Sequence, residues 1–285
     1  MRTGELPALE EKPVHDHLRT CRSCEESVDD LSELATAVKS LTVAPPRSCR
    51  AGVKAGICDA ADSVQVNGQT IWVAFSDKGL RMIHLGGDED QFRVAYAGRF
   101  GRDLDSHPLP ERLRRQVTDA VTGLGVSKPA VNLDDISGTE FERRVLEIMT
   151  KIPRGEVRTY AWVAEHAGKP KASRAVGNIC ARNVVPFVVP CHRVVPTAGG
   201  IGNYGMGEPL KRDLLRREGV EVDELETLAR RGVRFIGSKT TKIFCCPTCR
   251  DARRIREENR VPFHNAAGAA QKGFRPCQRC QPVAA

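Results

Sequence analysis

The chain reads Val184-Val185-Pro186-Phe187-Val188-Val189 and continues directly into Pro190-Cys191-His192-Arg193-Val194. The apolar run predicts a buried strand, and the residues after it predict a turn that presents Cys191 beside His192. A cysteine attacks as its thiolate, and a neighbouring imidazole or positive charge lowers the thiol pKa from its free value of about 8.5. Cys191 is therefore a candidate activated nucleophile. The alternative is a cysteine that packs as a small apolar side chain, as most buried cysteines do.

Other short motifs lie close to this stretch on both sides. They are Ile152-Pro153-Arg154-Gly155-Glu156, Thr159-Tyr160, Gly168-Lys169-Pro170-Lys171-Ala172, Arg174-Ala175-Val176-Gly177, Asn183, Gly202-Asn203-Tyr204 and Leu214-Leu215-Arg216-Arg217-Glu218-Gly219. In this order and spacing they resemble the methylated-DNA-protein-cysteine methyltransferase family, the single-turnover repair proteins for O6-alkylguanine. The resemblance implies an α/β fold with an RNase H-like subdomain over residues 60–135 and a winged helix-turn-helix methyltransferase domain over residues 136–222.

The resemblance also implies a role for each catalytic residue. Cys191 attacks the alkyl carbon of a base rotated out of the duplex, while His192 takes the thiol proton through a water and Glu218 orients the imidazole. Asn183 braces the active-site turn, and Tyr160 contacts guanine N3 and assists departure of the base as an acid. Because a thioether does not hydrolyse under cellular conditions, one turnover per molecule is expected.

Contacts to DNA follow from the same resemblance. Arg174 matches the arginine that fills the place of the flipped base, and Tyr160 also contacts the flipped phosphate. Positive charge around the second helix of the pair is expected to face phosphates, with Lys171 and Arg182 as candidates. The candidates for contact with the guanine edge are Val194, Tyr204 and Gly205, of which Gly205 offers only its backbone because some relatives carry serine there.

The amino-acid composition is compatible with a DNA-binding protein of this kind. The formal net charge of +8 favours an anionic partner, of which nucleic acid is the usual one. No apolar run approaches the roughly 20 residues that cross a bilayer, and the first residues lack the apolar stretch of a signal peptide, so a cytoplasmic monomer with no membrane contact is expected. Eleven cysteines in a reducing compartment point to metal binding or thiol chemistry rather than a disulfide framework.

The periodicity of apolar residues predicts the main elements. Strands are expected at residues 63–66, 70–75 and 80–85, in one antiparallel sheet with an Asn67-Gly68 hairpin turn. Helices are expected at residues 110–124, from 139 to before Pro153, and at 159–167, 171–182 and 209–218. The helix from residue 139 begins with a Thr139 and Glu142 capping box, and the next two have helix-turn-helix spacing.

The C-terminal cysteines have the spacing of a zinc site. Cys245, Cys249, Cys277 and Cys280 form a C-x3-C and a C-x2-C pair on a segment too short to hold a core alone. Residues 233–282 resemble the Ada-type zinc domain, whose first cysteine is both a ligand and the acceptor of a methyl group from a DNA methylphosphotriester. Cys245 matches that acceptor, and Thr241 and Arg275 match phosphate-contacting positions. Cys246 replaces the usual neighbouring arginine, so methylphosphotriester repair and structural or DNA-binding zinc both stay open.

The N-terminal segment, residues 1–45, resembles a zinc-binding anti-sigma segment. Its candidate ligands are His17, Cys21 and Cys24, and the helical spacing of apolar residues after Cys24 favours a helix. Zinc binding, a redox-sensitive pair and a metal-free remnant remain open, with a sigma factor or another regulator as possible partner. Cys49, Cys58 and Cys180 have no ligand spacing and are expected to be structural.

Taken with the resemblance, these motifs predict irreversible transfer of an alkyl group from O6-methylguanine, and from O4-methylthymine, in duplex DNA to Cys191. Structural zinc is expected and no organic cofactor is needed. Two alternatives from other classes are a methylation-damage sensor or transcriptional regulator that uses the terminal modules, and a damage-binding protein without chemistry.

Overall fold

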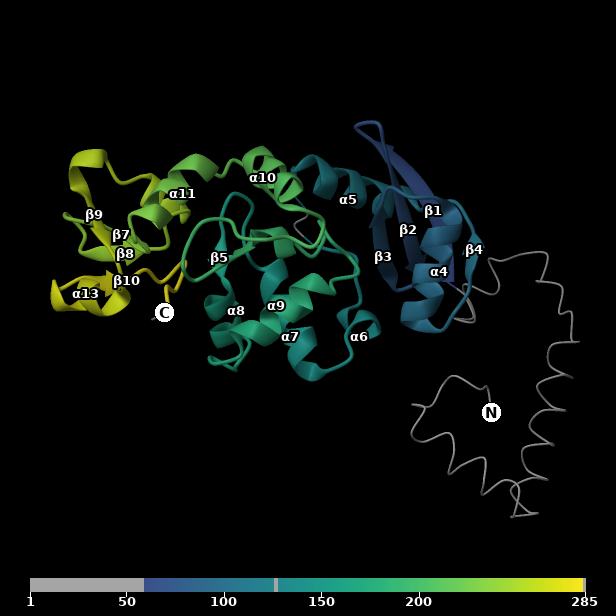
Figure 1. Cartoon of the computed structure of the whole chain (residues 1–285), viewed down its shortest axis with the longest axis horizontal. Helices are drawn as coiled ribbons and strands as arrows, with labels where there is room; N and C mark the ends of the chain where they lie inside the picture. The colour runs from purple at the N-terminus through teal and green to yellow at the C-terminus, as the bar shows by residue number, and fades with distance from the viewer. Residues whose placement is uncertain (1–58, 126–127, 284–285) are drawn as a thin grey trace, which may run out of the picture. The chain divides into compact units, whose positions relative to one another are not determined.

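The computed structural model describes residues 59–125 and 128–283 (Figure 1). Outside the described residues lie the segment 1–45 with its candidate ligands His17, Cys21 and Cys24, together with Cys49 and Cys58. The described residues form helices and two four-stranded sheets, which confirms the predicted mixed α/β class. No described helix has both the length and the apolar character that a membrane crossing requires.

The first sheet has the strand order β3-β2-β1-β4. Its strands are β1 (Asp59–Val66), β2 (Gln69–Ser76), β3 (Gly79–Leu85) and β4 (Leu104–Ser106). The first three are antiparallel, as the sequence predicts, and β4 pairs in parallel with β1. Asn67 at φ 52° and Gly68 at φ 75° supply the two positive φ angles that a two-residue hairpin turn needs. The sequence does not predict β4, because three residues are too few to show an alternation.

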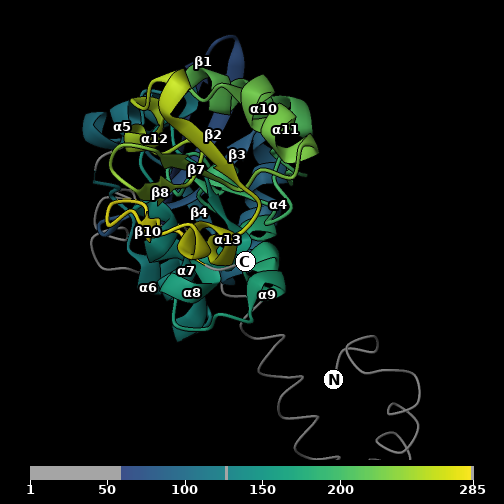
Figure 2. The same ribbon diagram turned by 90° about the vertical axis from the view of Figure 1, so that its left-hand side faces the viewer.

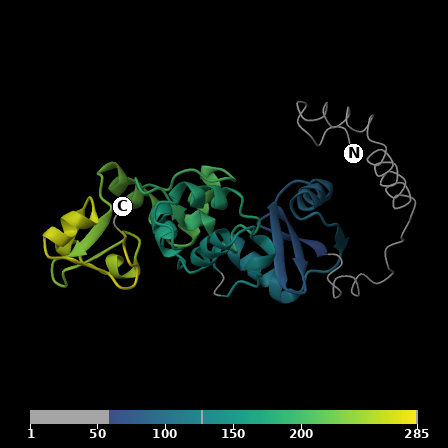
Figure 3. The same ribbon diagram turned by 90° about the horizontal axis from the view of Figure 1, so that it is seen from below.

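Two helices pack on this sheet, α4 (Glu89–Phe100) and α5 (Glu111–Thr122), and Figure 3 shows them on its two sides. Val117 of α5 shares a buried cluster with Val73 of β2, whereas Phe92 of α4 shares another with Ala74. Successive strand residues point to opposite faces, so the two helices cover opposite faces of the sheet. The apolar spacing in the sequence predicts α5 but not α4, because the apolar residues of α4 do not gather on one face: Phe92 and Tyr96 are buried, whereas Val94 is 73% exposed.

A short helix, α6 (Leu133–Ile136), precedes α7 (Glu140–Thr150). The Thr139 hydroxyl accepts the N–H of Glu142 at 3.1 Å, as the capping box predicts. The Glu142 carboxylate accepts from the N–H of Gly138 at 2.8 Å, one residue before the expected donor. Both bonds still satisfy backbone donors at the start of the helix, so the predicted cap is present in a shifted form.

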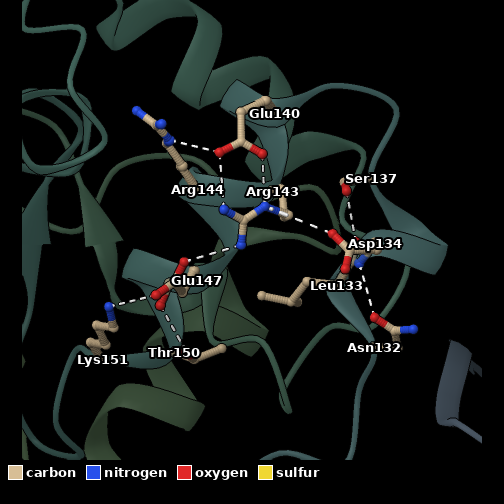
Figure 4. Close-up of polar contacts among 10 residues, drawn as sticks. All are labelled: Asn132, Leu133, Asp134, Ser137, Glu140, Arg143, Arg144, Glu147, Thr150 and Lys151. Carbon is tan, nitrogen blue, oxygen red and sulfur yellow. Dashed lines mark hydrogen bonds and ion pairs between the residues drawn. The ribbon is translucent and has the colours of Figure 1, made fainter.

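The solvent side of α7 carries a chain of ion pairs, which Figure 4 shows. Arg143 binds Glu140 at 2.8 Å and Glu147 at 3.3 Å, Arg144 binds Glu140 at 2.8 Å, and Lys151 binds Glu147 at 2.7 Å. The partners stand three or four residues apart, where such pairs stabilise a helix by a few tenths of a kcal/mol each. This charged surface therefore supports the helix and is not a candidate site.

The helix pair predicted after Pro153 is present as α8 (Tyr160–His166) and α9 (Ser173–Ala181). The two-residue strand β5 (Arg158–Thr159) precedes α8 and pairs in parallel with β6 (Val194–Val195), which follows the active-site turn. Thr159 caps α8 by accepting the N–H of Trp162 at 3.1 Å. The pairing of β5 with β6 therefore joins the start of the helix pair to the residues after Cys191.

The apolar run is half-buried at Val184 and buried from Val185 to Val189, but the strand predicted there is wrong. Pro186 has no N–H to donate to a sheet, and Phe187 has a φ of 69°, which no strand residue adopts. The N–H groups of Val188 and Val189 bond instead to the carbonyls of Pro186 and Val185, at 2.8 and 3.0 Å. The run is a series of tight turns under the site, which hydrophobicity alone cannot distinguish from a strand.

The remaining elements follow the active-site turn η1 (Cys191–Arg193). They are α10 (Glu208–Arg217), α11 (Val222–Arg230), β7 (Phe235–Ser238), β8 (Ile243–Cys245), α12 (Arg250–Arg253), η2 (Glu257–Asn259), β9 (Arg260–Phe263), α13 (Ala266–Gln271) and β10 (Arg275–Pro276). The second sheet has the order β10-β8-β7-β9, and Figure 2 labels three of its strands, β7, β8 and β10, together with α13. It has its own small core, in which Phe235, Phe244, Phe263 and Phe274 are buried.

Candidate active site and zinc cluster

Cys191 is the first residue of η1, and its side chain is 4% exposed. The side-chain amide of Asn183 donates to the Cys191 Sγ at 3.2 Å and to the Val189 carbonyl at 2.8 Å, while its oxygen accepts the N–H of Val185 at 3.1 Å. The hydroxyl of Tyr204 lies 3.9 Å from the sulfur. Asn183 thus links the turns under the site to the thiol by hydrogen bonds.

The pKa of the Cys191 thiol is raised, contrary to the lowering expected from the adjacent histidine. Burial is the main cause, and hydrogen bonds from Asn183 and Tyr204 and the positive charge of Lys211 oppose it only in part. The guanidinium of Arg193 is bound to Glu218, and Arg193 is not among the groups that lower the thiol pKa. The resting thiol is therefore neutral, and it can act as a nucleophile only if a base removes its proton.

His192 and Glu218 form the pair that the sequence predicts. The Nε2 of His192 lies 3.0 Å from a Glu218 carboxylate oxygen, and both side chains are buried. Burial lowers the pKa of His192, so the ring is neutral at physiological pH even though Glu218 favours its charged form. The Nδ1 atom is buried and has no hydrogen-bond partner among the described residues.

Glu218 is ionised in this pair. Burial raises the pKa of its carboxyl, but hydrogen bonds from His192 and Arg193 lower it to about 2 overall. An ionised carboxylate only accepts hydrogen bonds, so the proton of neutral His192 is assigned to Nε2 and the lone pair to Nδ1. His192 therefore offers an unoccupied buried acceptor atom, which is what a general base for the thiol requires.

Lys211 is a residue of this site that the sequence analysis missed. Its side chain is fully buried, and its ammonium donates to the carbonyls of Val194 at 2.7 Å and Asn203 at 3.3 Å. Burial lowers the pKa of Lys211 to about 8, with the sulfurs of Cys191 and Cys180 acting in the opposite direction. The sequence does indicate that Lys211 is buried, because it lies three and four residues before Leu214 and Leu215, on the apolar face of the predicted helix.

The predicted DNA-contacting side chains lie on or next to the helix pair. Tyr160 is the first residue of α8, half-buried, and burial raises its pKa to about 12, with smaller contributions from the sulfurs of Cys180 and Cys191. Arg174, Lys171 and Arg182 are exposed in the first turn of α9, just before it and at its C-terminal end. All three cations are therefore accessible to solvent.

The three residues expected at the guanine edge differ in their surroundings. The Val194 carbonyl already binds Lys211 and its N–H donates to the Cys191 carbonyl, so only a second lone pair on that oxygen is left for a ligand. Gly205 is exposed, and a Cβ placed there would find its nearest neighbour at 3.9 Å. Tyr204 is the side chain of the three that reaches the Cys191 sulfur.

The four C-terminal cysteines come together although 32 residues separate the first from the third. The sulfur atoms of Cys245, Cys249, Cys277 and Cys280 all lie within 4.8 Å of one another, and all four residues are buried. Zinc–sulfur bonds of about 2.3 Å in a tetrahedron place the sulfurs about 3.8 Å apart, so the cluster fits zinc with little movement. Cys246 is outside this set, and its N–H donates to the Cys280 sulfur at 3.4 Å.

A surface cavity of about 670 Å³ opens beside the cluster and is lined by Cys245 and Cys277. Its other lining residues are mostly cationic or hydroxyl-bearing, among them Ser238, Thr240, Thr241, Arg254, Arg256, Arg275 and Arg279. Arginines and hydroxyls are the side chains that bind phosphate oxygens. The cavity is therefore a candidate phosphate site next to a cysteine of the cluster.

Two parts of the chain match known protein families. Residues 140–220 match the DNA-binding domain of 6-O-methylguanine DNA methyltransferase, and residues 228–283 match the metal-binding domain of Ada. The second match and the sulfur geometry together identify the cysteine cluster as a structural zinc site.

Curated relatives agree with both matches. The chain is 35% identical over 147 residues to the bifunctional transcriptional activator/DNA repair enzyme Ada of Escherichia coli (strain K12), covering 51% of this chain and 41% of that one. It is 46% identical over 82 residues to a methylated-DNA--protein-cysteine methyltransferase of Methanosarcina acetivorans, covering 29% of this chain and 53% of that one. The chain thus spans about half the length of these relatives or less.

Solved structures are also similar. The O6-methylguanine-DNA methyltransferase of Pyrococcus kodakaraensis strain KOD1 is 31% identical, with a TM-score of 0.45, covering 57% of this chain and 99% of that chain. Atl1 of S. pombe in complex with damaged DNA is 36% identical, with a TM-score of 0.27, covering 29% of this chain and 78% of that chain. From the two matched domains and these identities, the chain belongs to the family of methylated-DNA-protein-cysteine methyltransferases that includes Ada.

Proposed function

We propose that this chain repairs alkylated DNA by taking the alkyl group of O6-methylguanine, and of O4-methylthymine, onto the Cys191 sulfur. The observation that carries the proposal is a buried thiol beside a neutral histidine whose partner is an ionised, buried glutamate. This is the nucleophile, base and orienting-group arrangement of covalent catalysis, with Cys191, His192 and Glu218 in the three roles. The neighbouring residues Asn183, Tyr204 and Lys211 each favour the thiolate once it forms.

The proposed reaction is a single nucleophilic displacement at the alkyl carbon. The thiol proton passes to Nδ1 of His192 through a water, and the thiolate attacks the alkyl carbon in line with the bond to O6. The carbon–sulfur bond forms as the carbon–oxygen bond breaks, and its electron pair moves into the guanine ring. Glu218 stabilises the imidazolium that results, and Tyr160 supplies a proton at guanine N3.

The damaged base must leave the helical stack, because a duplex does not expose its O6 group to a buried sulfur. We assign Arg174 to the gap that the base leaves, and Lys171 and Arg182 to the backbone phosphates. The exposed position of all three around α9 supports this assignment. Since a thioether is not cleaved in the cell, each molecule reacts once.

The test is intact mass and peptide mapping of the zinc-loaded chain after incubation with duplex DNA that contains O6-methylguanine. The expected result is a gain of one methylene, located on Cys191. Cys191→Ala should abolish the gain, whereas Cys180→Ala, the matched loss of another non-cluster cysteine nearby, should keep it. An unmodified Cys191 refutes the proposal and favours the damage-binding or regulatory alternatives.

A second candidate function, methyl transfer from a DNA methylphosphotriester to Cys245, is favoured by the cationic cavity against that residue. In this reaction the phosphate oxygen leaves as an anion, which the nearby arginines stabilise. Mapping after reaction with a defined methylphosphotriester duplex should find methyl on Cys245 and lose it in Arg275→Ala. Methyl on Cys191 alone, from DNA carrying both lesions, reduces the zinc module to a structural or DNA-binding role.

Regulation through a partner of residues 1–45 is the remaining alternative. Its test is capture of a sigma factor by the full chain, compared with a variant that carries alanine at His17, Cys21 and Cys24. Equal capture by both removes the zinc-dependent anti-sigma interpretation.

A further inference from the structure

The segment Glu156–Trp162 stands between the active-site turn and the zinc cluster. On one side it contains β5, whose Arg158 and Thr159 pair with Val194 and Val195 just after η1. It then leads directly into α8, the helix that begins with Tyr160. Any shift of this segment therefore moves the base-contacting tyrosine and the residues after Cys191 together.

On its other side the segment is hydrogen-bonded to the zinc module. The N–H of Val157 donates to the Thr248 hydroxyl at 2.9 Å, a buried contact. The indole N–H of Trp162 donates to the carbonyls of Cys280 at 2.9 Å and Gln281 at 3.0 Å. These bonds tie the backbone of a zinc ligand directly to a side chain of the helix pair.

A buried ion pair belongs to the same contact. Glu156 and Arg158 have side chains 2% and 3% exposed, and their closest nitrogen–oxygen distance is 2.5 Å. The second oxygen of Glu156 accepts the N–H of Arg250 at 3.1 Å and lies 3.8 Å from the guanidinium of Arg279. A buried carboxylate is tolerated only when its acceptors are satisfied, so the zinc module completes the environment of this pair.

The contact residues of the module depend on the metal for their positions. Thr248 and Arg250 flank Cys249, and Arg279 and Gln281 flank Cys280. In a small module of this kind, metal binding supplies folding free energy that the protein core does not. Without zinc, the loops that hold Glu156, Val157 and Trp162 lose the anchor they share.

We propose that the zinc module is a metal-dependent clamp on the DNA-reading helix pair, so that zinc at the four cysteines controls how fast Cys191 reacts with alkylated duplex DNA. Trp162 and Thr248 are the positioning residues of this clamp: they touch neither substrate nor reacting atoms and act through α8 and β5. The inference rests on the proposed function at Cys191. It adds that the reaction rate at Cys191 depends on whether the zinc module holds its metal.

Trp162 provides a readout that is independent of activity. The chain has two tryptophans, so Trp72→Phe leaves Trp162 as the sole indole. In the zinc-loaded full chain under reducing conditions, removal of zinc by a chelator should shift the Trp162 emission to the red and reduce hydrogen-exchange protection over residues 156–166. Zinc should restore both. Unchanged emission and protection refute the clamp.

Two variants test the clamp with zinc still bound. Trp162→Phe removes the bonds to Cys280 and Gln281, and Thr248→Val removes the bond to Val157. Each should slow methylation of Cys191 by duplex O6-methylguanine about fivefold, the effect of roughly one net hydrogen bond. Reaction with the free base O6-methylguanine should slow less than the duplex reaction, because the free base has no backbone for the helix pair to contact and is affected only through Tyr160 and the residues after Cys191.

Trp72→Phe is the matched control, because its indole also donates to a carbonyl, that of Gly87, far along the chain from the site. It should keep the duplex rate. Equal rates for all variants on duplex DNA, or equal losses on duplex and free base, refute the clamp. If zinc-loaded wild type never methylates Cys191, the proposed function fails, whereas the response of Trp162 to zinc still decides whether the module holds α8.

Discussion

The Nε2 of His192 lies 3.0 Å from Oε1 of Glu218, and the other ring nitrogen, Nδ1, is buried without a hydrogen-bond partner among the described residues. The histidine is thereby oriented and assigned one tautomer before any substrate arrives. The pKa of the Cys191 thiol is raised, so in the proposed reaction a base must remove its proton before the thiolate forms.

Replacing Glu218 by glutamine should slow methyl transfer to Cys191 about a hundredfold, because the neutral amide no longer stabilises the imidazolium or selects the tautomer. It should also lower the free energy of unfolding by about 3 kcal/mol, since the buried guanidinium of Arg193 loses its counter-ion. Single-turnover kinetics and urea denaturation measure the two effects. The control is Glu226→Gln, which breaks the partly exposed pair with Arg212. An unchanged rate in Glu218→Gln contradicts the assigned role.

Lys211→Met should slow methyl transfer about tenfold below pH 8, because the variant loses the cation that favours the Cys191 thiolate. Above that pH the difference from wild type should shrink, since Lys211 with its pKa of about 8 is then neutral in the wild type as well. The measurement is the rate of methylation against pH for both proteins. A rate ratio that is the same across this range removes the charge of Lys211 from the mechanism.

The lowered pKa of Lys211 also predicts how the free energy of unfolding varies with pH. Its folded pKa of about 8 lies below the ordinary value of 10.5, so between these values the unfolded chain binds the proton and the folded chain does not. Stability from this group therefore rises with pH through that window, by up to about 3 kcal/mol, and is flat below it. Urea denaturation of wild type and Lys211→Met at several pH values tests this prediction. It is contradicted if the free energy of unfolding of wild type, relative to that of the variant, falls as the pH rises from about 8 to 10.5.

Arg174→Ala should weaken binding to duplex O6-methylguanine DNA and slow methylation by roughly tenfold or more, while the reaction with the free base stays within about twofold. The reason is that Arg174 is exposed in the first turn of α9, so its loss should leave the buried Cys191 pocket intact. The matched control is Arg115→Ala, which removes an exposed arginine of α5 paired with Glu111. Equal losses on duplex and free base would place Arg174 in the chemistry instead.

Gly237→Ala should destabilise the zinc module by about 1 to 3 kcal/mol. A Cβ at this position would lie 2.6 Å from the ring of Phe263 and 2.7 Å from the ring of Phe274, inside the small aromatic core. Gly98→Ala in α4 is the control, because its Cβ meets nothing within 4 Å and alanine favours a helix. Thermal melting of the zinc-loaded proteins should move in opposite directions for the two variants.

Much of the fold follows from local pattern. The Asn67-Gly68 turn, the Thr139 cap and the apolar spacing of α5 are signals within a few residues, and the structure contains the elements that they predict. The strand β4 and the helix α4 are not predicted in this way, because β4 is too short to show an alternation and the apolar residues of α4 are split between its buried and exposed faces.

The order of residues along the chain establishes which reactive groups the protein has. They are the adjacent Cys191 and His192, the downstream Glu218, and two cysteine pairs with zinc-ligand spacing. The conformation, burial and pKa values of these groups follow from the tertiary structure. It turned Val184–Val189 into tight turns, raised the pKa of Cys191, placed Lys211 against Val194 and bound Trp162 to the zinc loops. Burial and long-range hydrogen bonds depend on residues far apart in sequence, and no local period encodes them.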